Sequence, residues 1–321
     1  MALAERARRP GWWLVAGKEF ADHLMSVRFG LLVAIVVLLA AGAVYAAAGA
    51  IRDVASEASG APSLMLRVLT VAPERLPPFY TLVGFLAPLL GIAFGFDSVN
   101  GERAQGTLPR LLSQPIHRDD VINGKAAAGL AVVTLVLVSL TALVCGVALF
   151  RLGVRPSLED LLRILVWLAV AVVYVAFWLS FATLCSVWLR RAATSALMAI
   201  AVWLVATLFI GLLSGLLADA LAPVPQDAGF DQALANARLE QQLARLSPST
   251  LYEEATVALL SPETRAFGFV LPEQVDRAIP TPLSLSQSLL VVWPQVVALV
   301  ALTVASFAGA YVLFMRQEVR A

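Results

Sequence analysis

The sequence predicts an all-α integral membrane protein with six transmembrane helices. Of its 321 residues, 60% are hydrophobic and 14% are charged, whereas soluble domains carry about 25% charged residues. A helix needs about 20 mostly apolar residues to cross a bilayer. Six uncharged windows meet this requirement: 29–51, 76–96, 126–150, 164–189, 192–218 and 278–314. The last window is longer than a span, and its helix is expected near 285–315.

The distribution of positive charge predicts the orientation. Six spans place both termini on one side of the membrane. Lys and Arg are denser in the N-terminal arm, the second and fourth loops and the tail, so this side is expected to be cytoplasmic. The clearest cues are Arg6, Arg8, Arg9, Arg190, Arg191 and Arg316.

Several site classes are disfavoured by composition. The net charge of +1 gives no basic signature for nucleic acid. Cys145 and Cys185 lie inside apolar windows, where small buried side chains are expected rather than a disulfide or metal pair. His23 and His117 have no second ligand at metal spacing. We therefore expect no metal and no nucleic-acid partner.

The segment 11–28 before the first window is predicted to be an amphipathic helix lying in the membrane interface. Its two adjacent tryptophans suit headgroup depth. Lys18 with Asp22 and Glu19 with His23 are expected pairs one turn apart. The alternative is that the segment simply begins a long first span. The apolar stripe comprises Trp13, Phe20, Leu24 and Val27.

The loop 219–283 is predicted to be a helical extracytoplasmic cap. Asp231 can start a helix that continues to about Leu246. A second helix is expected from a capping box at 250–253 through about Leu260. No ligand signature occurs in this loop, so a role as substrate or partner surface stays open.

The segment 97–125 is a charged interruption between the second and third windows. Thr107 is a suitable N-cap for a short helix that Pro115 would end. Asp119 or Asp120 can cap the third span, expected to begin around residue 125. This short helix is interpreted as a docking surface, although it could also lie on the membrane. Its apolar face would consist of Leu108, Leu111 and Leu112.

Gly101 and Gly106 in this segment have the spacing of a phosphate loop. The segment lacks the lysine that contacts nucleotide phosphates, and it follows a membrane helix rather than a buried strand. It is therefore not expected to bind nucleotide. No other segment has a Walker motif, so any ATP that drives this protein must bind a partner.

The pattern GERxxGTLxxLLSxPxxRxxxxxGK, from 101 to 125, resembles the ABC-2 type exporter permeases. The six spans, the interfacial helix and the large loop before the last span resemble the same family. The similarity is strongest to the sodium-efflux, bacitracin-resistance and nitrous-oxide-reductase maturation permeases. Pro109 departs from the family pattern, because a helix former usually holds that place.

The resemblance implies the permease subunit of an ATP-driven exporter in a bacterial or archaeal cell membrane. Two permeases, identical or different, would pair and work by alternating access with two cytoplasmic ATPase subunits. This chain would be no enzyme and hold no cofactor, since ATP and magnesium would bind the ATPase. The implied organisation is an arm and interfacial helix at 1–28, five spans with the coupling loop at 29–217, the extracytoplasmic loop at 218–284, and the last span with a cytoplasmic tail at 285–321.

The resemblance also assigns the loop between spans 2 and 3 as a coupling helix. Glu102 and Arg103 would make polar contacts with the ATPase, and Arg118 and Lys125 would fix the helix to the membrane surface. Glu19 would join this bundle. The implied coupling residues are Glu102, Arg103, Gly106, Thr107, Leu108, Leu111, Leu112, Pro115, Arg118 and Lys125. The implied interfacial residues are Trp12, Trp13, Lys18, Glu19 and Phe20.

Two rival functions are considered. A secondary transporter usually carries ionisable residues within its spans, and the six windows contain none. A membrane enzyme would need a cluster of catalytic groups, but Asp119 and Asp120 are better explained as helix caps. A scaffold that binds an ATPase without transport stays open. The uncharged spans favour an apolar or amphipathic cargo.

Overall fold

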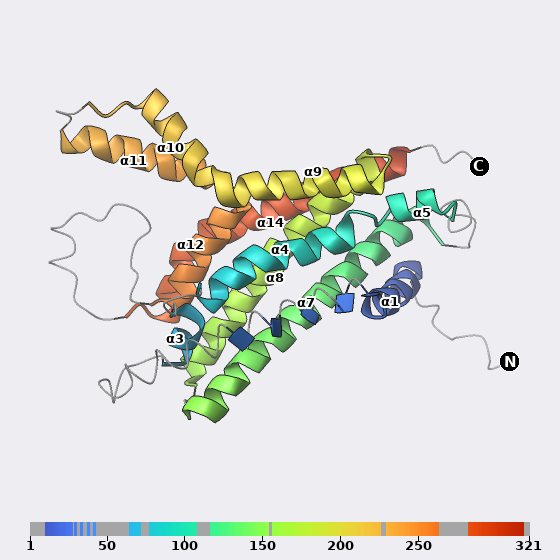
Figure 1. The fold of residues 1–321 in the computed structure, drawn as a ribbon, viewed down its shortest axis with the longest axis horizontal. Coiled ribbons are helices and arrows are strands. Elements are labelled where there is room, and N and C mark those ends of the chain that lie inside the picture. The colour runs from blue at the N-terminus through green and yellow to red at the C-terminus, as the bar shows by residue number, and fades with distance from the viewer. Residues whose placement is uncertain are drawn as a thin grey trace.

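The protein is a bundle of long helices that run side by side (Figure 1). Helices are the only regular secondary structure in the part of the chain described here. The computed structural model describes residues 10–27, 64–71, 77–107, 116–153, 156–225, 229–262 and 282–317, together with isolated residues between 29 and 42.

Five helical stretches are long and apolar enough to cross a membrane. They correspond to the last five predicted windows, while most of the window 29–51 lies outside the described residues. The stretches are built from α4 (Phe79–Gly95) with α5 (Asn100–Ala104), α7 (Arg118–Leu152), α8 (Leu158–Trp188), α9 (Ala192–Leu204) with η1 (Val205–Phe209) and α10 (Ile210–Leu221), and α14 (Leu285–Arg316).

Helix α7 begins at Arg118, two turns before the predicted start around residue 125. The predicted cap is confirmed for Asp120, whose carboxylate accepts the N–H of His117 at 3.1 Å. The early start was missed because the first two turns are polar. These turns pack against other protein elements rather than lipid, so their polarity does not end the helix.

Helix α8 is the centre of the bundle. Its large side chains Trp167, Tyr174 and Trp178 are completely buried. Helix α4 approaches α8 closely at two glycines one turn apart. A Cβ atom at Gly95 would lie 2.6 Å from the carbonyl oxygen of Leu179, so only glycine allows this packing.

The span formed by α9 and α10 is bent at η1, a π-helical turn (Figure 1). A π-bulge shifts the backbone register and bends a helix. The hydroxyl of Ser247 donates to the carbonyl of Ala206 at 2.5 Å within this turn. The bend therefore has a specific polar contact with the chain that follows α11.

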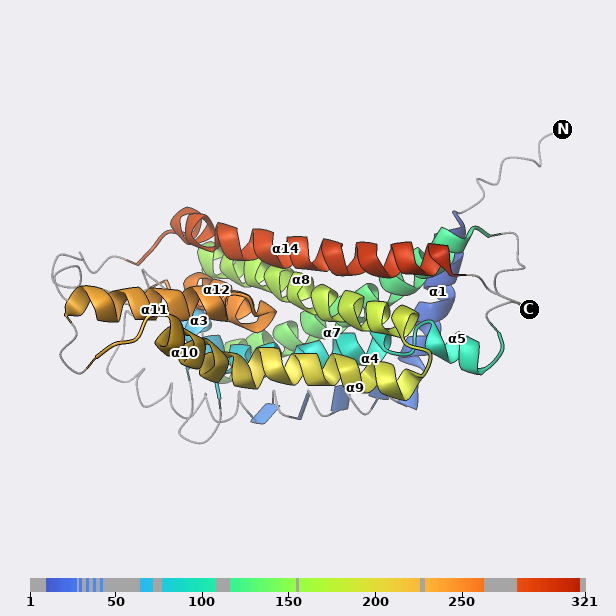
Figure 2. The ribbon, with the colours of Figure 1, turned by 90° about the horizontal axis from the view of Figure 1, so that it is seen from above.

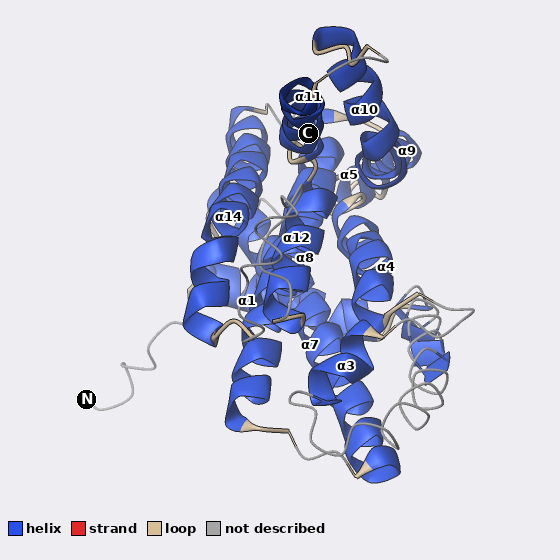
Figure 3. Ribbon diagram, turned by 90° about the vertical axis from the view of Figure 1, so that its left-hand side faces the viewer, coloured by secondary structure: helices blue, strands red, loops and turns tan. Residues whose placement is uncertain are grey.

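The predicted extracytoplasmic loop forms helices α11 (Phe230–Ala244) and α12 (Pro248–Leu260). Helix α12 is capped by Ser247, which accepts the N–H of Ser249 at 3.1 Å, and not at Thr250 as expected. Figure 3 shows α12 between α14 and α4, and most of its residues are buried. This helix is thus part of the bundle and not a cap over it.

Two short helices complete the fold. Helix α3 (Leu64–Thr70) was not predicted, and its buried apolar residues pack near α4 and α12. Helix α1 (Gly11–Leu24) ends four residues before the predicted 28, because the Ser26 hydroxyl donates to the His23 carbonyl and accepts the N–H of Phe29. Figure 2 shows α1 running across the direction of the long helices. We call the end of the bundle with α1 and α5 the α5 end, and the opposite end the α12 end.

Candidate functional site

The predicted docking segment starts with α5, which is held against α8 at the α5 end. The backbone N–H groups of Val99 and Asn100 each donate to the hydroxyl of Ser186 at 3.1 Å. Ser186 is completely buried near the end of α8. Sequence reasoning missed this residue, because a lone serine in an apolar window has no distinguishing pattern.

Gly106 ends α5 and turns the chain towards the predicted coupling helix. Its φ of 67° lies in the left-handed region, which glycine adopts at little cost. Thr107 N–H donates to the carbonyl of Glu102, and Gly106 N–H donates to that of Arg103. These two bonds form a Schellman motif. The first glycine of the supposed phosphate loop lies inside α5, and the second directly follows its C-cap, Gln105.

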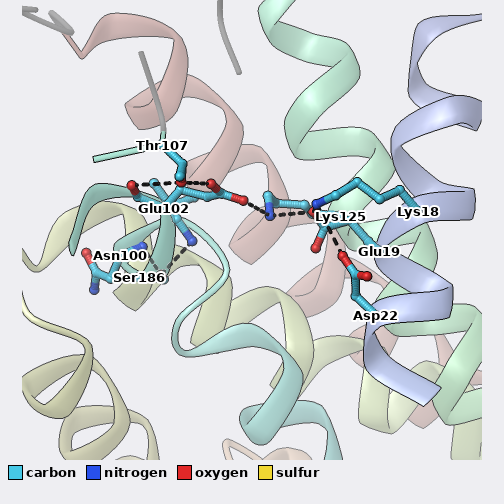
Figure 4. A network of polar contacts seen from close by, with 9 residues as sticks. Lys18, Glu19, Asp22, Asn100, Glu102, Thr107, Lys125 and Ser186 are labelled. Atoms are coloured by element: carbon cyan, nitrogen blue, oxygen red, sulfur yellow. Dashed lines mark hydrogen bonds and ion pairs between the residues drawn. The ribbon is translucent and has the colours of Figure 1, made fainter. Parts of the chain in front are cut away.

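Lys125 joins three elements at the centre of the site (Figure 4). Its Nζ atom donates to Glu19 Oε1 on α1 at 2.9 Å and to Glu102 Oε1 on α5 at 3.2 Å. Lys125 and Glu19 are both buried. A buried ammonium is unfavourable without charged partners, so these two carboxylates are what allow Lys125 to stand two turns inside α7.

The ion-pair network extends beyond Lys125 in both directions. The Thr107 hydroxyl donates to the Glu102 carboxylate. On α1, Lys18 lies 3.4 Å from Glu19 and 3.2 Å from Asp22. Burial lowers the pKa of Lys18, but these two carboxylates outweigh it, and the net shift of the pKa is upward. The network therefore runs without a break from α1 to Thr107, three residues after the end of α5.

Of the two side-chain pairs predicted on α1, one is confirmed. Lys18 pairs with Asp22 as expected. Glu19 pairs with Lys125 and Lys18 rather than with His23. The His23 ring lies 4.8 Å from the ring of Phe94, and burial lowers the pKa of His23. A lysine distant in sequence outcompetes the local partner.

Helix α1 lies directly on the first turns of α7. A Cβ atom at Gly124 would lie 2.6 Å from the Cβ of Val15. The N–H of Trp12 donates to the Asp120 carboxylate at 2.9 Å. The adjacent Gly124 and Lys125 thus have separate roles, since the glycine admits α1 and the lysine binds its carboxylate.

A second polar cluster surrounds Gln317, directly after α14. Its backbone carbonyl accepts from Arg118 at 2.9 Å, and its side-chain amide donates to the Val187 carbonyl at 2.7 Å. Arg103 donates to the Gln317 side-chain oxygen, and Arg118 also lies over the ring of Phe314, 5.8 Å from its centre. Sequence reasoning missed Gln317, because its importance depends on three distant helices.

The predicted site residues thus fall into three groups. Those that the two polar clusters and the turn bring together are Lys18, Glu19, Glu102, Arg103, Gly106, Thr107, Arg118 and Lys125. Arg118 and Lys125 have protein partners where membrane contacts were expected. On α1, Trp12 and Trp13 are exposed and Phe20 is half-buried. Four fall outside the described residues: Leu108, Leu111, Leu112 and Pro115.

The arrangement connects distant helices through charged and polar side chains. These side chains join α1, α5, α7 and the residue after α14 at one end of an apolar bundle. The described residues include no group of three or more His, Cys, Asp or Glu that could hold a metal ion. A bundle of helices long and apolar enough to cross a membrane, joined at one end by polar contacts, defines a polytopic membrane protein.

Comparison with known proteins identifies the family. The family model described as ABC-2 family transporter protein matches residues 13–319, so the chain belongs to this family of transporters. Two similar proteins are each described as a probable ABC transporter permease protein NosY. The protein from Pseudomonas aeruginosa is 28% identical over 116 residues, which cover 36% of this chain and 38% of the relative.

The second relative, from Stutzerimonas stutzeri, is 31% identical over 144 residues. This match covers 44% of this chain and 48% of the relative, so the chain spans less than half the length of either relative. The resemblance to ABC-2 permeases is confirmed, and the chain is a membrane component of an ABC transporter.

Proposed function

We propose that this chain is the permease subunit of an ATP-driven exporter and that its α5 end faces the cytoplasm. A separate ABC ATPase docks there and binds ATP and magnesium. Membership of the ABC-2 family supports the assignment of transport to this chain and of ATP binding to a separate protein. Gly106 supports it too, because it ends α5 in a left-handed turn instead of starting a phosphate-binding helix.

The observation that carries the proposal is the bridge from Glu102 through Lys125 to Glu19. The segment 107–115 continues directly from α5. A force applied to that segment reaches α7 and α1 through Lys125, and α14 through Arg103 and Gln317. Helices joined in this way move as one rigid body, which is the motion that alternating access requires.

The complete transporter contains two such permeases, identical or different, and two ATPase subunits. Nucleotide-driven closure of the ATPase pair moves the two α5 ends together. The exposed position of Trp12 and Trp13 on α1 supports an interfacial place for that helix at the cytoplasmic surface.

The test is purification of the tagged full-length chain from its native membrane. The expected result is a copurifying soluble protein that has a Walker A lysine, identified by mass spectrometry. Leu111→Asp should remove this protein by placing a charge on the docking face. Leu246→Asp is the matched control, because Leu246 is exposed at the α12 end and should leave copurification unchanged.

Two results would contradict the proposal. Unchanged copurification in Leu111→Asp would show that the ATPase docks elsewhere. Normal copurification of wild type without ATP-dependent transport of any cargo in vesicles would identify a scaffold in place of a permease.

A further inference from the structure

A pocket of about 450 Å³ opens at the α12 end, between α4, α8, the bent span and α12. Ligand pockets in proteins commonly have volumes of about 300–1,000 Å³. Its lining combines aromatic rings and hydroxyl groups with a few aliphatic side chains. Its lining residues include Tyr80, Phe85, Tyr174, Thr207, Gly211 and Glu253.

One wall of the pocket is fixed by a chain of hydroxyl groups. The Tyr174 hydroxyl donates to the Gly84 carbonyl at 3.1 Å and lies 2.9 Å from the Ser249 hydroxyl. Ser249 in turn lies 2.8 Å from the hydroxyl of Thr207. The Tyr174 ring stacks on Tyr252, with ring centres 4.5 Å apart. The pocket is therefore built from side chains that already hold one another in place.

A second wall is the π-helical turn η1, which contributes Thr207. Such turns cost helical stability and occur frequently at functional sites. In this chain the turn widens the helix beside the pocket. Gly211 follows on the same wall, where a Cβ atom would meet nothing within 4 Å. Open space thus borders the backbone at this point.

The charge of the pocket comes from Glu253. Among its described lining residues it is the one carboxylate, and none is Lys or Arg. The adjacent Glu254 is neutralised by Arg245 at 2.9 Å and accepts from Gln295. Glu253 makes no ion pair with any described residue. Burial, followed by repulsion from Glu254, raises the pKa of Glu253.

We propose that this pocket binds an amphipathic organic cation, with its apolar body against the aromatic rings and its charge near Glu253. Tyrosine and phenylalanine faces attract cations, and the carboxylate adds a charge complement that an anion would lack. That the cation is the exported cargo rests on the proposed function. Binding itself requires only this chain.

The test uses tetraphenylphosphonium and tetraphenylborate, two ions of similar size and shape with opposite charge. Each is titrated into the purified full-length chain in nanodiscs, without ATPase. Tetraphenylphosphonium should bind more tightly than tetraphenylborate. Glu253→Gln should weaken its binding about twofold to fivefold, the range for one exposed charge interaction. Glu240→Gln, the same change on the exposed face of α11, should have no effect.

A second pair of variants locates the ligand. Gly211→Leu should fill the pocket without a clash and abolish binding. Gly146→Leu is the matched control, because a Cβ atom there also meets nothing within 4 Å but lies on α7 away from the pocket. Equal affinity for the two ions, or full binding by Gly211→Leu, would overturn the proposal. Loss of ATPase copurification with intact cation binding would refute the proposed function alone.

A lipid with an ammonium headgroup has the same chemistry as a free organic cation. The two sources are separated by repeating the titration in phosphatidylglycerol nanodiscs with and without phosphatidylethanolamine. Competition by phosphatidylethanolamine in wild type, absent in Glu253→Gln, identifies the lipid. No competition identifies the free cation, and either result supports a cation site.

Discussion

Lys125 at the α5 end and Arg163 at the α12 end are both buried cations inside membrane-crossing helices, but they are neutralised differently. Lys125 binds two carboxylates from two other elements. Arg163 binds one carboxylate, Glu159 on its own helix, at 2.9 Å. Its remaining partners are the carbonyls of Leu259 and Leu283 and the hydroxyl of Ser288.

The difference separates a connection made of charges from one made mostly of neutral groups. At the α12 end, neutral acceptors do not repel one another, so Arg163 can hold the end of α12 to α8 and to the start of α14 without a second carboxylate. At the α5 end, two carboxylates from separate elements lie against the cation between them. Loss of that cation therefore leaves a repulsion at the α5 end that has no counterpart at the α12 end.

The largest expected effect is at Arg163. Arg163→Met should lower the free energy of unfolding by about 4 kcal/mol, because the buried Leu259 carbonyl and Ser288 hydroxyl and the half-buried Leu283 carbonyl lose their donor. Steric trapping in bicelles measures this quantity. Glu159→Gln should lose under 1 kcal/mol, because Glu159 is largely exposed. Equal losses in the two variants would show that the neutral acceptors contribute little.

A smaller effect is expected at Lys125. Lys125→Met should cost about 3 kcal/mol, since Glu19 and Glu102 then lose the buried cation between them and keep only the exposed Lys18 beside Glu19. Adding Glu102→Gln should restore part of this loss, because the repulsion disappears. The same measurement on single and double variants gives the coupling energy. Adding Glu159→Gln to Arg163→Met should restore no stability, because no second carboxylate repels Glu159 there. Restored stability would show that the two ends are neutralised in the same way.

One glycine with a left-handed backbone lies at each end of the bundle, so the cost of backbone strain, about 1 kcal/mol, can be compared between the ends. Gly106 ends α5 and Gly153 ends α7, with φ of 67° and 64°, and a Cβ atom would meet nothing within 4 Å at either. Alanine at each should lower the free energy of unfolding by about 1 kcal/mol from backbone strain alone. Gly101→Ala, inside α5, should be neutral or stabilising. A much larger loss at Gly106 would show that the turn has contacts beyond the described residues.

Much of the fold was predictable from the sequence, because apolar length decides where helices cross a membrane. Windows 76–96 and 192–218 were recognised as spans for that reason. The π-turn, helix α3 and the insertion of α12 were not. Each depends on contacts such as Ser247 with Ala206, which join residues 41 positions apart and leave no periodic signal.

The segment that carries the site was predictable because its charges interrupt two apolar windows. The roles of Glu102, Lys125 and Glu19 came from the resemblance to ABC-2 permeases, and the partner of each required the folded chain. Ser186 and Gln317 were missed, because neither is charged and both act through backbone groups of distant elements. The pocket at the α12 end was missed for the same reason, since hydroxyl groups from four elements form it.

The smallest expected effect is a pH dependence at the α12 end. Because the pKa of Glu253 is raised above its ordinary value of 4.5, its carboxylate becomes protonated at a higher pH than an unperturbed glutamate. Binding of tetraphenylphosphonium, which has no proton to lose, should therefore weaken as pH falls through that raised pKa. The other titratable groups in the pocket lining or next to Glu253 are Tyr80, Tyr174, Tyr252 and Glu254, and Glu254 is paired with Arg245. The affinities of wild type and Glu253→Gln should thus converge at low pH, whereas parallel curves would assign the dependence to another group.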